Sequence, residues 1–246
     1  MLTIYGNEPS RIYGGENSKV GEHNFFVSLT EDERTFCGAA IIDDRHVITA
    51  AHCVANFTDI DVNNTAISIN ITDLQIGGQN YSIKKIFIHR NYNETDPASH
   101  NDVTICRTNE TMQLGANQQK SVFALPIALA SGPTESGKNV TVVGSGITES
   151  YPKYLSETLK KLSVKTLAIS ECQKYFEDKL WDGQICTISP IGKGTCLGDS
   201  GGPVVNSEGE LVGIISWGMP CAIDYPDVHT NVSYFIDWIT DIINYY

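Results

Sequence analysis

Three short segments of the chain carry side chains whose types could combine in nucleophilic catalysis. One reads Thr-Ala-Ala-His-Cys and contains His52, the second reads His-Asn-Asp-Val-Thr-Ile and contains Asp102, and the third reads Gly-Asp-Ser-Gly-Gly-Pro and contains Ser200. A serine hydroxyl is a poor nucleophile until a neighbouring base takes its proton, and a histidine oriented by a carboxylate is such a base. Each segment alone also has an ordinary structural explanation. Their joint occurrence is what indicates a catalytic site.

In this order, the segments resemble those of the trypsin/chymotrypsin family of serine endopeptidases, and the resemblance covers residues 12–246. It implies an all-β fold of two six-stranded antiparallel Greek-key barrels, with the active site between them and a C-terminal helix. It also implies an acyl-enzyme mechanism in which His52 is the general base, Asp102 orients it and Ser200 is the nucleophile. The amides of Gly198 and Ser200 would then form the oxyanion hole.

The elements that must position these residues are mostly short strands. Apolar and β-branched runs, separated by clusters of Gly, Asn, Asp or Ser, predict an all-β sandwich or barrel. The expected strands are Phe25–Leu29, Ala40–Ile42, Val47–Thr49, Ala66–Ile71, Ile83–Ile88, Val140–Val143, Pro203–Val205 and Leu211–Ile215. Helices are expected at 170–176, with its serine as N-cap, and at 233–246, where apolar residues recur at helical spacing. The loop-rich stretch 115–137 would connect two halves, at about 12–122 and 123–246.

The composition favours an exported globular protein. The chain has 246 residues, of which 41% are hydrophobic and 19% charged, and its formal net charge of −12 argues against nucleic-acid binding, which requires a basic face. No run approaches the 18 apolar residues of a membrane span. N-glycosylation sequons, which agree with secretion although some can arise by chance, begin at Asn56, Asn63, Asn70, Asn80, Asn93, Asn109, Asn139 and Asn231.

The seven cysteines are scattered and form no Cys-x-x-Cys pair, which disfavours zinc or thioredoxin-like sites and suits disulfides in an oxidising compartment. Seven is odd, so at least one cysteine is free or pairs outside the chain. The family resemblance implies three bridges and leaves Cys106 as a buried free thiol. The implied pairs are Cys37–Cys53, Cys172–Cys186 and Cys196–Cys221. Vertebrate relatives often have a further bridge, whose two positions are occupied here by Val140 and Asn206.

The N-terminal segment resembles an activation site. Residues 1–11 would be a propeptide, and cleavage after Arg11 would free the ammonium group of Ile12 to pair with Asp199 inside the peptidase domain, 12–246. A buried carboxylate is costly without such a partner, so the ion pair could order the oxyanion hole. The sequence after the cleavage site is Ile-Tyr-Gly-Gly, with tyrosine where the family usually has valine.

Specificity in this family depends on the residue six positions before the catalytic serine, which forms the pocket base. Here it is Gly194, where trypsins have the aspartate that selects Arg and Lys. Ser216, Trp217 and Gly218 would line the pocket and leave its mouth open, and Asp227 replaces the usual glycine of its wall. This pattern resembles the crab digestive collagenases and implies broad specificity for Arg and Lys together with Leu, Phe and Tyr. The alternative is that the new aspartate points into a solvated loop.

No cofactor or metal is expected, because the 62–82 segment lacks the paired glutamates that bind calcium in trypsins. The Gly144-Ser145-Gly146 turn has serine where the family usually has tryptophan. Expected partners are protein or peptide substrates, an activating protease and protein inhibitors, with no nucleic acid or membrane, and the chain is expected to be a monomer. Two alternatives stay open: a catalytically silent homologue acting as a binding or cascade cofactor protein, and a lectin-like β module.

Overall fold

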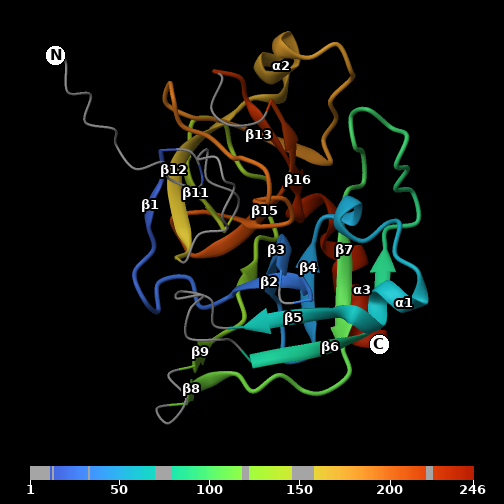
Figure 1. The fold of residues 1–246 in the computed structure, drawn as a ribbon. Helices are drawn as coiled ribbons and strands as arrows, with labels where there is room; N and C mark the ends of the chain where they lie inside the picture. Colours follow the sequence, from blue (N-terminus) through green and yellow to red (C-terminus); the bar gives the residue numbers. More distant parts are fainter. Residues whose placement is uncertain are drawn as a thin grey trace, which may run out of the picture.

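Two closed β-barrels, one above the other in Figure 1, form the body of the molecule. A computed structural model describes residues 12, 14–32, 34–69, 79–117, 122–145, 158–219 and 224–246. The features predicted for the propeptide, and for Arg11, Tyr13, Asn70, Gly146 and Cys221, lie outside the described residues.

The first barrel closes in the strand order β2-β3-β4-β7-β6-β5, with every neighbouring pair antiparallel. Its strands are β2 (Phe26–Glu31), β3 (Arg34–Ile41), β4 (His46–Thr49), β5 (Thr65–Ile69), β6 (Gln79–Ile88) and β7 (Thr104–Thr108). Alternate residues of a strand face opposite sides, so one face of each strand fills the interior. The interior side chains include Val27, Leu29, Ile41, Ile48, Ile67 and Ile105.

The second barrel closes because β12 pairs with both β11 and β13. Its strands are β11 (Asn139–Gly144), β12 (Lys160–Leu167), β13 (Gln184–Ile188), β14 (Pro203–Val205), β15 (Glu210–Gly218) and β16 (Asp227–Asn231). Strand β1 (Glu16–Asn17) pairs with β12 from outside, so the start of the described chain contacts the second barrel and not the first. The predicted architecture of two six-stranded antiparallel barrels is therefore confirmed.

The helices are few and short apart from the C-terminal one. Helix α3 (Ile236–Tyr245) follows the 3₁₀ turn η3 (Val232–Phe235) and crosses back to pack on the first barrel. Phe235 and Ile239 belong to that barrel's core cluster, and the rings of Phe87 and Tyr246 lie 4.9 Å apart. The remaining elements are η1 (Ala51–Cys53), α1 (Asp59–Asn64), β8 (Gly115–Asn117), β9 (Val122–Ala124), β10 (Ala128–Leu129), α2 (Ile169–Cys172) and η2 (Gln173–Tyr175).

All eight predicted strands overlap observed ones, although Phe25 and Ile42 lie just outside β2 and β3, and both predicted helices are present. The predicted N-cap at Ser170 is wrong. Helix α2 begins at Ile169, the N-cap is Ala168, and no side chain caps the helix. The stretch 115–137 also carries the short strands β8, β9 and β10 in addition to loop.

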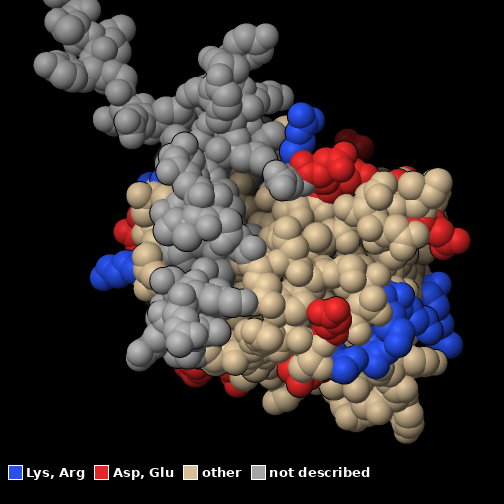
Figure 2. All heavy atoms as spheres, turned by 60° about the horizontal axis from the view of Figure 1, so that its bottom comes forward, with Lys and Arg blue, Asp and Glu red and all other residues tan. Residues whose placement is uncertain are grey.

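Charged side chains are spread over the surface. On the face drawn in Figure 2, acidic side chains form several separate groups, and basic ones gather mainly at the lower right. Within the described part of the chain, no helix is long and apolar enough to cross a membrane.

The barrels touch where the glycine-rich turn after Ser200 meets the first barrel. Gly201 has a φ of +77°, and a Cβ atom added to it would lie 2.1 Å from Thr49 Oγ1 and 2.4 Å from the carbonyl oxygen of Gly38. Only a residue without a side chain allows this approach in this backbone conformation. The turn is fastened there because the amide of Gly38 donates to the carbonyl oxygen of Ser200 over 2.8 Å.

We expect Gly201→Ala to destabilise the fold more than a matched change elsewhere. The left-handed conformation costs alanine about 1–2 kcal/mol and the overpacked contact adds about 1–3 kcal/mol. Gly209, with a φ of +82° and nothing within 4 Å of an added Cβ, is the control, because Gly209→Ala adds only the backbone cost. Thermal unfolding measures the difference, at about 2–4 °C per kcal/mol for a chain of this size. Equal midpoints for the two variants would contradict the close-contact explanation.

Candidate active site

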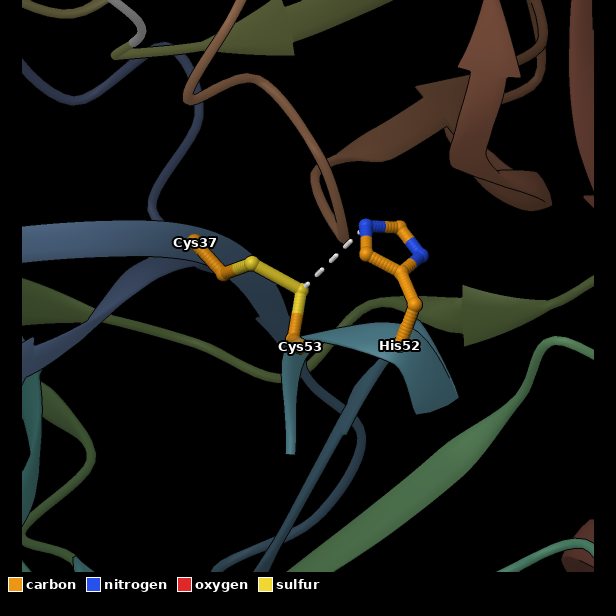
Figure 3. A group of neighbouring side chains, drawn as sticks. All are labelled: Cys37, His52 and Cys53. Carbon is orange, nitrogen blue, oxygen red and sulfur yellow. Dashed lines mark hydrogen bonds between the residues drawn. A yellow bond between two sulfur atoms is a disulfide. The ribbon is translucent and has the colours of Figure 1, made fainter. Parts of the chain in front are cut away.

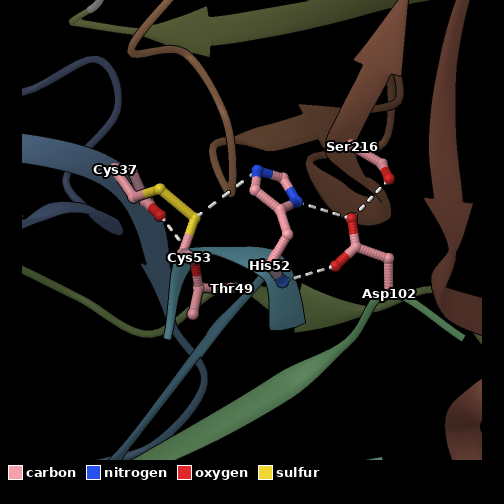
Figure 4. The surroundings of a disulfide bond; sticks show 7 residues. Cys37, Thr49, His52, Cys53, Asp102 and Ser216 are labelled. Carbon is pink, nitrogen blue, oxygen red and sulfur yellow. Dashed lines mark hydrogen bonds and ion pairs between the residues drawn. A yellow bond between two sulfur atoms is a disulfide. The ribbon is translucent and has the colours of Figure 1, made fainter. Parts of the chain in front are cut away.

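His52 and Asp102 meet at one end of the first barrel. His52 lies in η1 directly after β4, and Asp102 lies just before β7. These strands are antiparallel neighbours in which Thr49 faces Thr104, so the end of one lies beside the start of the other. The Nδ1 atom of His52 donates to Asp102 Oδ2 over 2.8 Å, and its backbone amide donates to Oδ1 over 2.9 Å (Figure 4).

The carboxylate of Asp102 is completely buried and is held by both barrels. Ser216 Oγ, from β15 of the second barrel, also donates to its Oδ2 atom. The carbonyl oxygen of Asp102 accepts a buried bond of 2.6 Å from Thr230 Oγ1 of β16. A buried charge is tolerated only with such partners, and here they also fix its position.

The electrostatics of the pair make the imidazole of His52 a stronger base. Burial alone would lower the pKa of His52, but the hydrogen bond from its ring to Asp102 and the negative charge of that carboxylate raise the pKa above its ordinary value. The His52 side chain keeps 33% of its surface exposed, so its other ring edge stays accessible. His52 is therefore placed to accept a proton at its exposed ring edge while Asp102 stabilises the resulting charge.

Ser200 lies in the wall of a neighbouring pocket, in the turn that Gly38 fastens to the first barrel. Among the described residues, no hydrogen bond joins its hydroxyl to His52. The Nε2 atom of His52 instead lies 3.9 Å from Cys53 Sγ (Figure 3). The structure therefore joins two of the three predicted catalytic residues directly and brings the third to the adjoining surface.

The amides predicted to form the oxyanion hole are free to bind. Gly198 has a φ of +91°, which glycine adopts readily. In the part of the chain that the structure describes, the backbone N–H groups of Gly198 and Ser200 donate to no protein acceptor, although a buried amide normally has one. Both residues are partly exposed and are therefore available to a ligand.

The sulfur atoms beside His52 belong to a disulfide. Cys37, His52 and Cys53 place their possible ligand atoms within 4.8 Å of one another, as metal ligands would (Figure 3). However, Cys37 and Cys53 are joined by an S–S bond of 2.00 Å. Cysteine binds a metal as a thiolate, which a disulfide does not offer, so Cys37 and Cys53 form a structural bridge beside His52.

The other cysteines follow the family pattern where they are described. Cys172 and Cys186 form a disulfide, and Cys196 is also disulfide-bonded, while its predicted partner Cys221 lies outside the described residues. Cys106 is a free, fully buried thiol in the first barrel, and burial raises its pKa to about 12. The prediction of a buried free thiol is confirmed.

A pocket of about 180 Å³ opens beside Ser200. Leu197 and Met219 at this pocket were not singled out from the sequence, although apolar residues beside the Gly-Asp-Ser and Ser-Trp-Gly motifs are a signal for them. Both are about half exposed, at 54% and 46%. The lining residues are Thr195, Cys196, Leu197, Ser200, Ile215, Ser216, Trp217, Gly218 and Met219. Three of the five predicted pocket residues are among them.

The other two, Gly194 and Asp227, lie directly behind this lining. Gly194 is buried next to Thr195. The Asp227 carboxylate accepts a hydrogen bond of 3.3 Å from the amide of Thr195, and its Oδ1 atom would lie 2.8 Å from a Cβ added to Gly218. The side chain is 95% buried, with 5% of its surface exposed, and does not point into solvent. Burial raises its pKa to about 6, despite the opposing hydrogen bonds from Thr195.

Two further polar side chains share this barrel interior and were missed. His229 lies two residues after Asp227 on β16, so the two side chains face the same side of the sheet. His229 is paired in register with Ile185 of β13, which belongs to the core. Its Nε2 atom lies 2.8 Å from Thr187 Oγ1, and burial lowers its pKa to about 3, which keeps the ring neutral. No sequence signal set His229 apart, because it belongs to no motif.

The predicted activation residues lie against the same barrel. Ile12 is wholly buried in the core cluster of the second barrel. It has a φ of +36°, a left-handed conformation that is strained for a β-branched residue. Asp199 is also wholly buried and accepts a hydrogen bond of 2.9 Å from the amide of Cys196. Its carboxylate lies against Gly144, where an added Cβ would be 2.2 Å from Oδ1.

Comparison with known proteins agrees with this geometry. A family model described as Trypsin matches residues 12–239. The chain is 31% identical over 242 residues to a trypsin of Phaedon cochleariae, covering 97% of this chain and 90% of that protein. It is 34% identical over 244 residues to trypsin-1 of Astacus astacus, covering 93% and 98%. The solved structure of neuropsin, a serine protease expressed in the limbic system of mouse brain, matches with a TM-score of 0.82 at 27% identity, covering 93% of this chain and 98% of that one. The chain thus belongs to the trypsin family and is a trypsin-like serine endopeptidase.

Proposed function

We propose that the chain is the precursor of a secreted endopeptidase that is activated by cleavage after Arg11 and has broad primary specificity. The observation that carries the proposal is the hydrogen-bonded pair of His52 and Asp102 beside a pocket with Ser200 in its wall. Its substrates are proteins or peptides, and an activating protease is its first partner.

The proposed reaction proceeds through an acyl-enzyme. Ser200 Oγ attacks the carbonyl carbon of the scissile peptide bond while His52 Nε2 takes the hydroxyl proton. Asp102 stabilises the resulting imidazolium through its bond to Nδ1. The negative oxygen of the tetrahedral intermediate accepts hydrogen bonds from the amides of Gly198 and Ser200, donors that are worth roughly 2.7–4 kcal/mol each in the transition state. The imidazolium then protonates the leaving amine, and water hydrolyses the ester by the same route.

Activation by cleavage is supported by the backbone of Ile12. Its φ torsion of +36° includes the carbonyl carbon of residue 11, so cutting the 11–12 bond removes the torsion and its strain. Left-handed conformations of ordinary residues cost about 1–2 kcal/mol. The released ammonium group would pair with Asp199, whose buried carboxylate lies in the same barrel. That charge pair would stabilise the turn that carries Gly198 and Ser200.

Mixed specificity is supported by the placement of Asp227. The pocket base offers no charge, because Gly194 stands where an aspartate would select Arg and Lys. A basic side chain gains a charge-assisted hydrogen bond with the off-centre Asp227, which nets about 1.5–3 kcal/mol. A large apolar side chain gains burial, which is also worth about 1.5–3 kcal/mol. Because the two gains are similar, neither substrate class dominates, a pattern that resembles the crab digestive collagenases.

The first prediction from this proposal is that Ser200→Ala and His52→Ala each lower kcat by on the order of 10⁶-fold, since nucleophile and base act as one unit. Steady-state hydrolysis of a peptide substrate by the activated protein measures the loss. Ser207→Ala, in the exposed turn between β14 and β15, is the control and should keep full activity. A serine-directed phosphonate should label Ser200 alone. Full activity in Ser200→Ala would refute the mechanism.

The second prediction is that the uncut chain is inactive and that trypsin treatment raises its activity sharply, with a new N-terminus reading Ile-Tyr-Gly-Gly. Arg11→Gln should stay inactive after the same treatment because the site is lost. Lys19→Gln, which removes an exposed basic residue nearby, should be activated normally. The Asp199→Asn variant should be cleaved, but its activity should rise little, because the new ammonium group lacks its ionic partner. Equal activity before and after cleavage would contradict the proposal.

The third prediction concerns pH and the pocket. Asp227 binds a basic side chain only when ionised, so the ratio of kcat/KM for Arg and Lys substrates to that for Leu and Phe substrates should fall as the pH drops through about 6. The titration of His52 affects both classes alike and cancels in this ratio. Asp227→Asn should lower cleavage after Arg and Lys about tenfold or more and make the ratio independent of pH. If both substrate classes change in parallel, Asp227 does not contact the substrate.

A further inference from the structure

The segment 89–103 joins β6 to β7 and carries Asp102 near its end, and it reaches from the first barrel to the second (Figure 1). Two contacts fasten it there. Gln184 Nε2, at the start of β13, donates to the carbonyl oxygen of Ala98 over 2.7 Å in a buried bond. His100 Nε2 lies 2.8 Å from the carbonyl oxygen of Lys179, in the loop that precedes β13. The chain that delivers Asp102 is therefore held from the opposite barrel.

The ring of His100 makes two polar contacts that both require it to donate. Its Nδ1 atom lies 2.9 Å from Asp96 Oδ2, and its Nε2 atom faces the Lys179 carbonyl. Carboxylate and carbonyl oxygens only accept hydrogen bonds, so the ring of His100 is the group that donates in either contact. The ring also meets the indole of Trp181 edge to face, with centroids 5.3 Å apart.

The backbone on both sides of His100 is strained. Ser99 and Asn101 have φ values of +48° and +59°, in the left-handed region that non-glycine residues rarely adopt. Such conformations persist only where surrounding contacts enforce them. Asp96 accepts hydrogen bonds from the amides of Ala98 and His100, which closes the turn within the segment. The contact with Lys179 then fixes that turn relative to the second barrel.

We propose that His100 is a positioning residue for catalysis, which holds Asp102 in register with His52 by bridging Asp96 of its own segment and the Lys179 carbonyl of the second barrel. The inference rests on the proposed function, in which Asp102 orients the catalytic histidine. His100 does not touch the substrate. It acts through the strained backbone that separates it from Asp102 by one residue.

The test compares three variants of the activated protein. His100→Phe keeps a ring against Trp181 and removes both donors. His100→Gln keeps one N–H donor for the Lys179 carbonyl. His89→Phe is the matched control, because it makes the same change in the same segment, at a ring that, in the described chain, contacts the rings of Phe235 and Trp238 and the amide of Asn91.

We expect His100→Phe to lower kcat about tenfold with a smaller change in KM, since small displacements of catalytic groups are costly. His100→Gln should recover most of that loss, and His89→Phe should keep kcat. The proton NMR signal of His52 Nδ1–H should be sharp in the parent and in His100→Gln, and broadened in His100→Phe by exchange with water. A purely structural role would lower the melting temperature and leave this signal and kcat unchanged below it.

A wild-type kcat and a sharp Nδ1–H signal in His100→Phe would overturn the proposal. Asp102→Asn, measured alongside, separates the two hypotheses. If Asp102→Asn abolishes activity while His100→Phe leaves activity unchanged, the positioning role fails and the proposed function stands. If Asp102→Asn is fully active, the proposed function itself fails. Should His100→Phe not fold, Asp96→Asn removes the other partner of the ring and is expected to lower kcat in the same direction.

Discussion

A completely buried carboxylate must receive hydrogen bonds, and Asp102 receives them from both barrels. The ring and backbone amide of His52 belong to the first barrel, whereas Ser216 belongs to the second. Leaving such a group without donors costs several kcal/mol, so a relative displacement of the barrels is penalised at this point. The close approach at Gly201 and the pocket beside Ser200 both depend on the barrel arrangement that these hydrogen bonds stabilise.

The second barrel differs from the first in what fills it. The interior of the first barrel is largely apolar, while the second encloses Asp227, Thr187 and His229. Burial pushes the two titratable groups toward their neutral forms, with pKa values of about 6 for Asp227 and about 3 for His229. Polar groups in a barrel core reduce its stability, but they place a titratable group directly behind the pocket.

Many of the strands could be predicted, because a strand with an apolar face contains a run of β-branched residues that is visible in the sequence. Strand β16 was missed because its interior positions carry Asp227 and His229, which hide the apolar alternation. Helix α1 was also missed, although Thr58 and Asp61 form a capping box that the sequence displays. The cap predicted at Ser170 failed because β12 ends at Leu167 and the chain turns directly into the helix. The start of helix α2 is therefore set by the end of strand β12 and not by a capping side chain.

The sequence by itself determined the family, because its motifs combine residue types in a recognisable order, and the resemblance to that family in turn predicted the candidate catalytic residues and the pairing of Cys37 with Cys53. Only the tertiary structure decided that Asp227 is buried behind the pocket and that His100 reaches the second barrel. These facts depend on contacts between strands far apart in the chain, and spacing along the sequence carries no information about such distances. Burial, which sets the protonation of Asp227, is a property of the packed barrel and not of any segment alone.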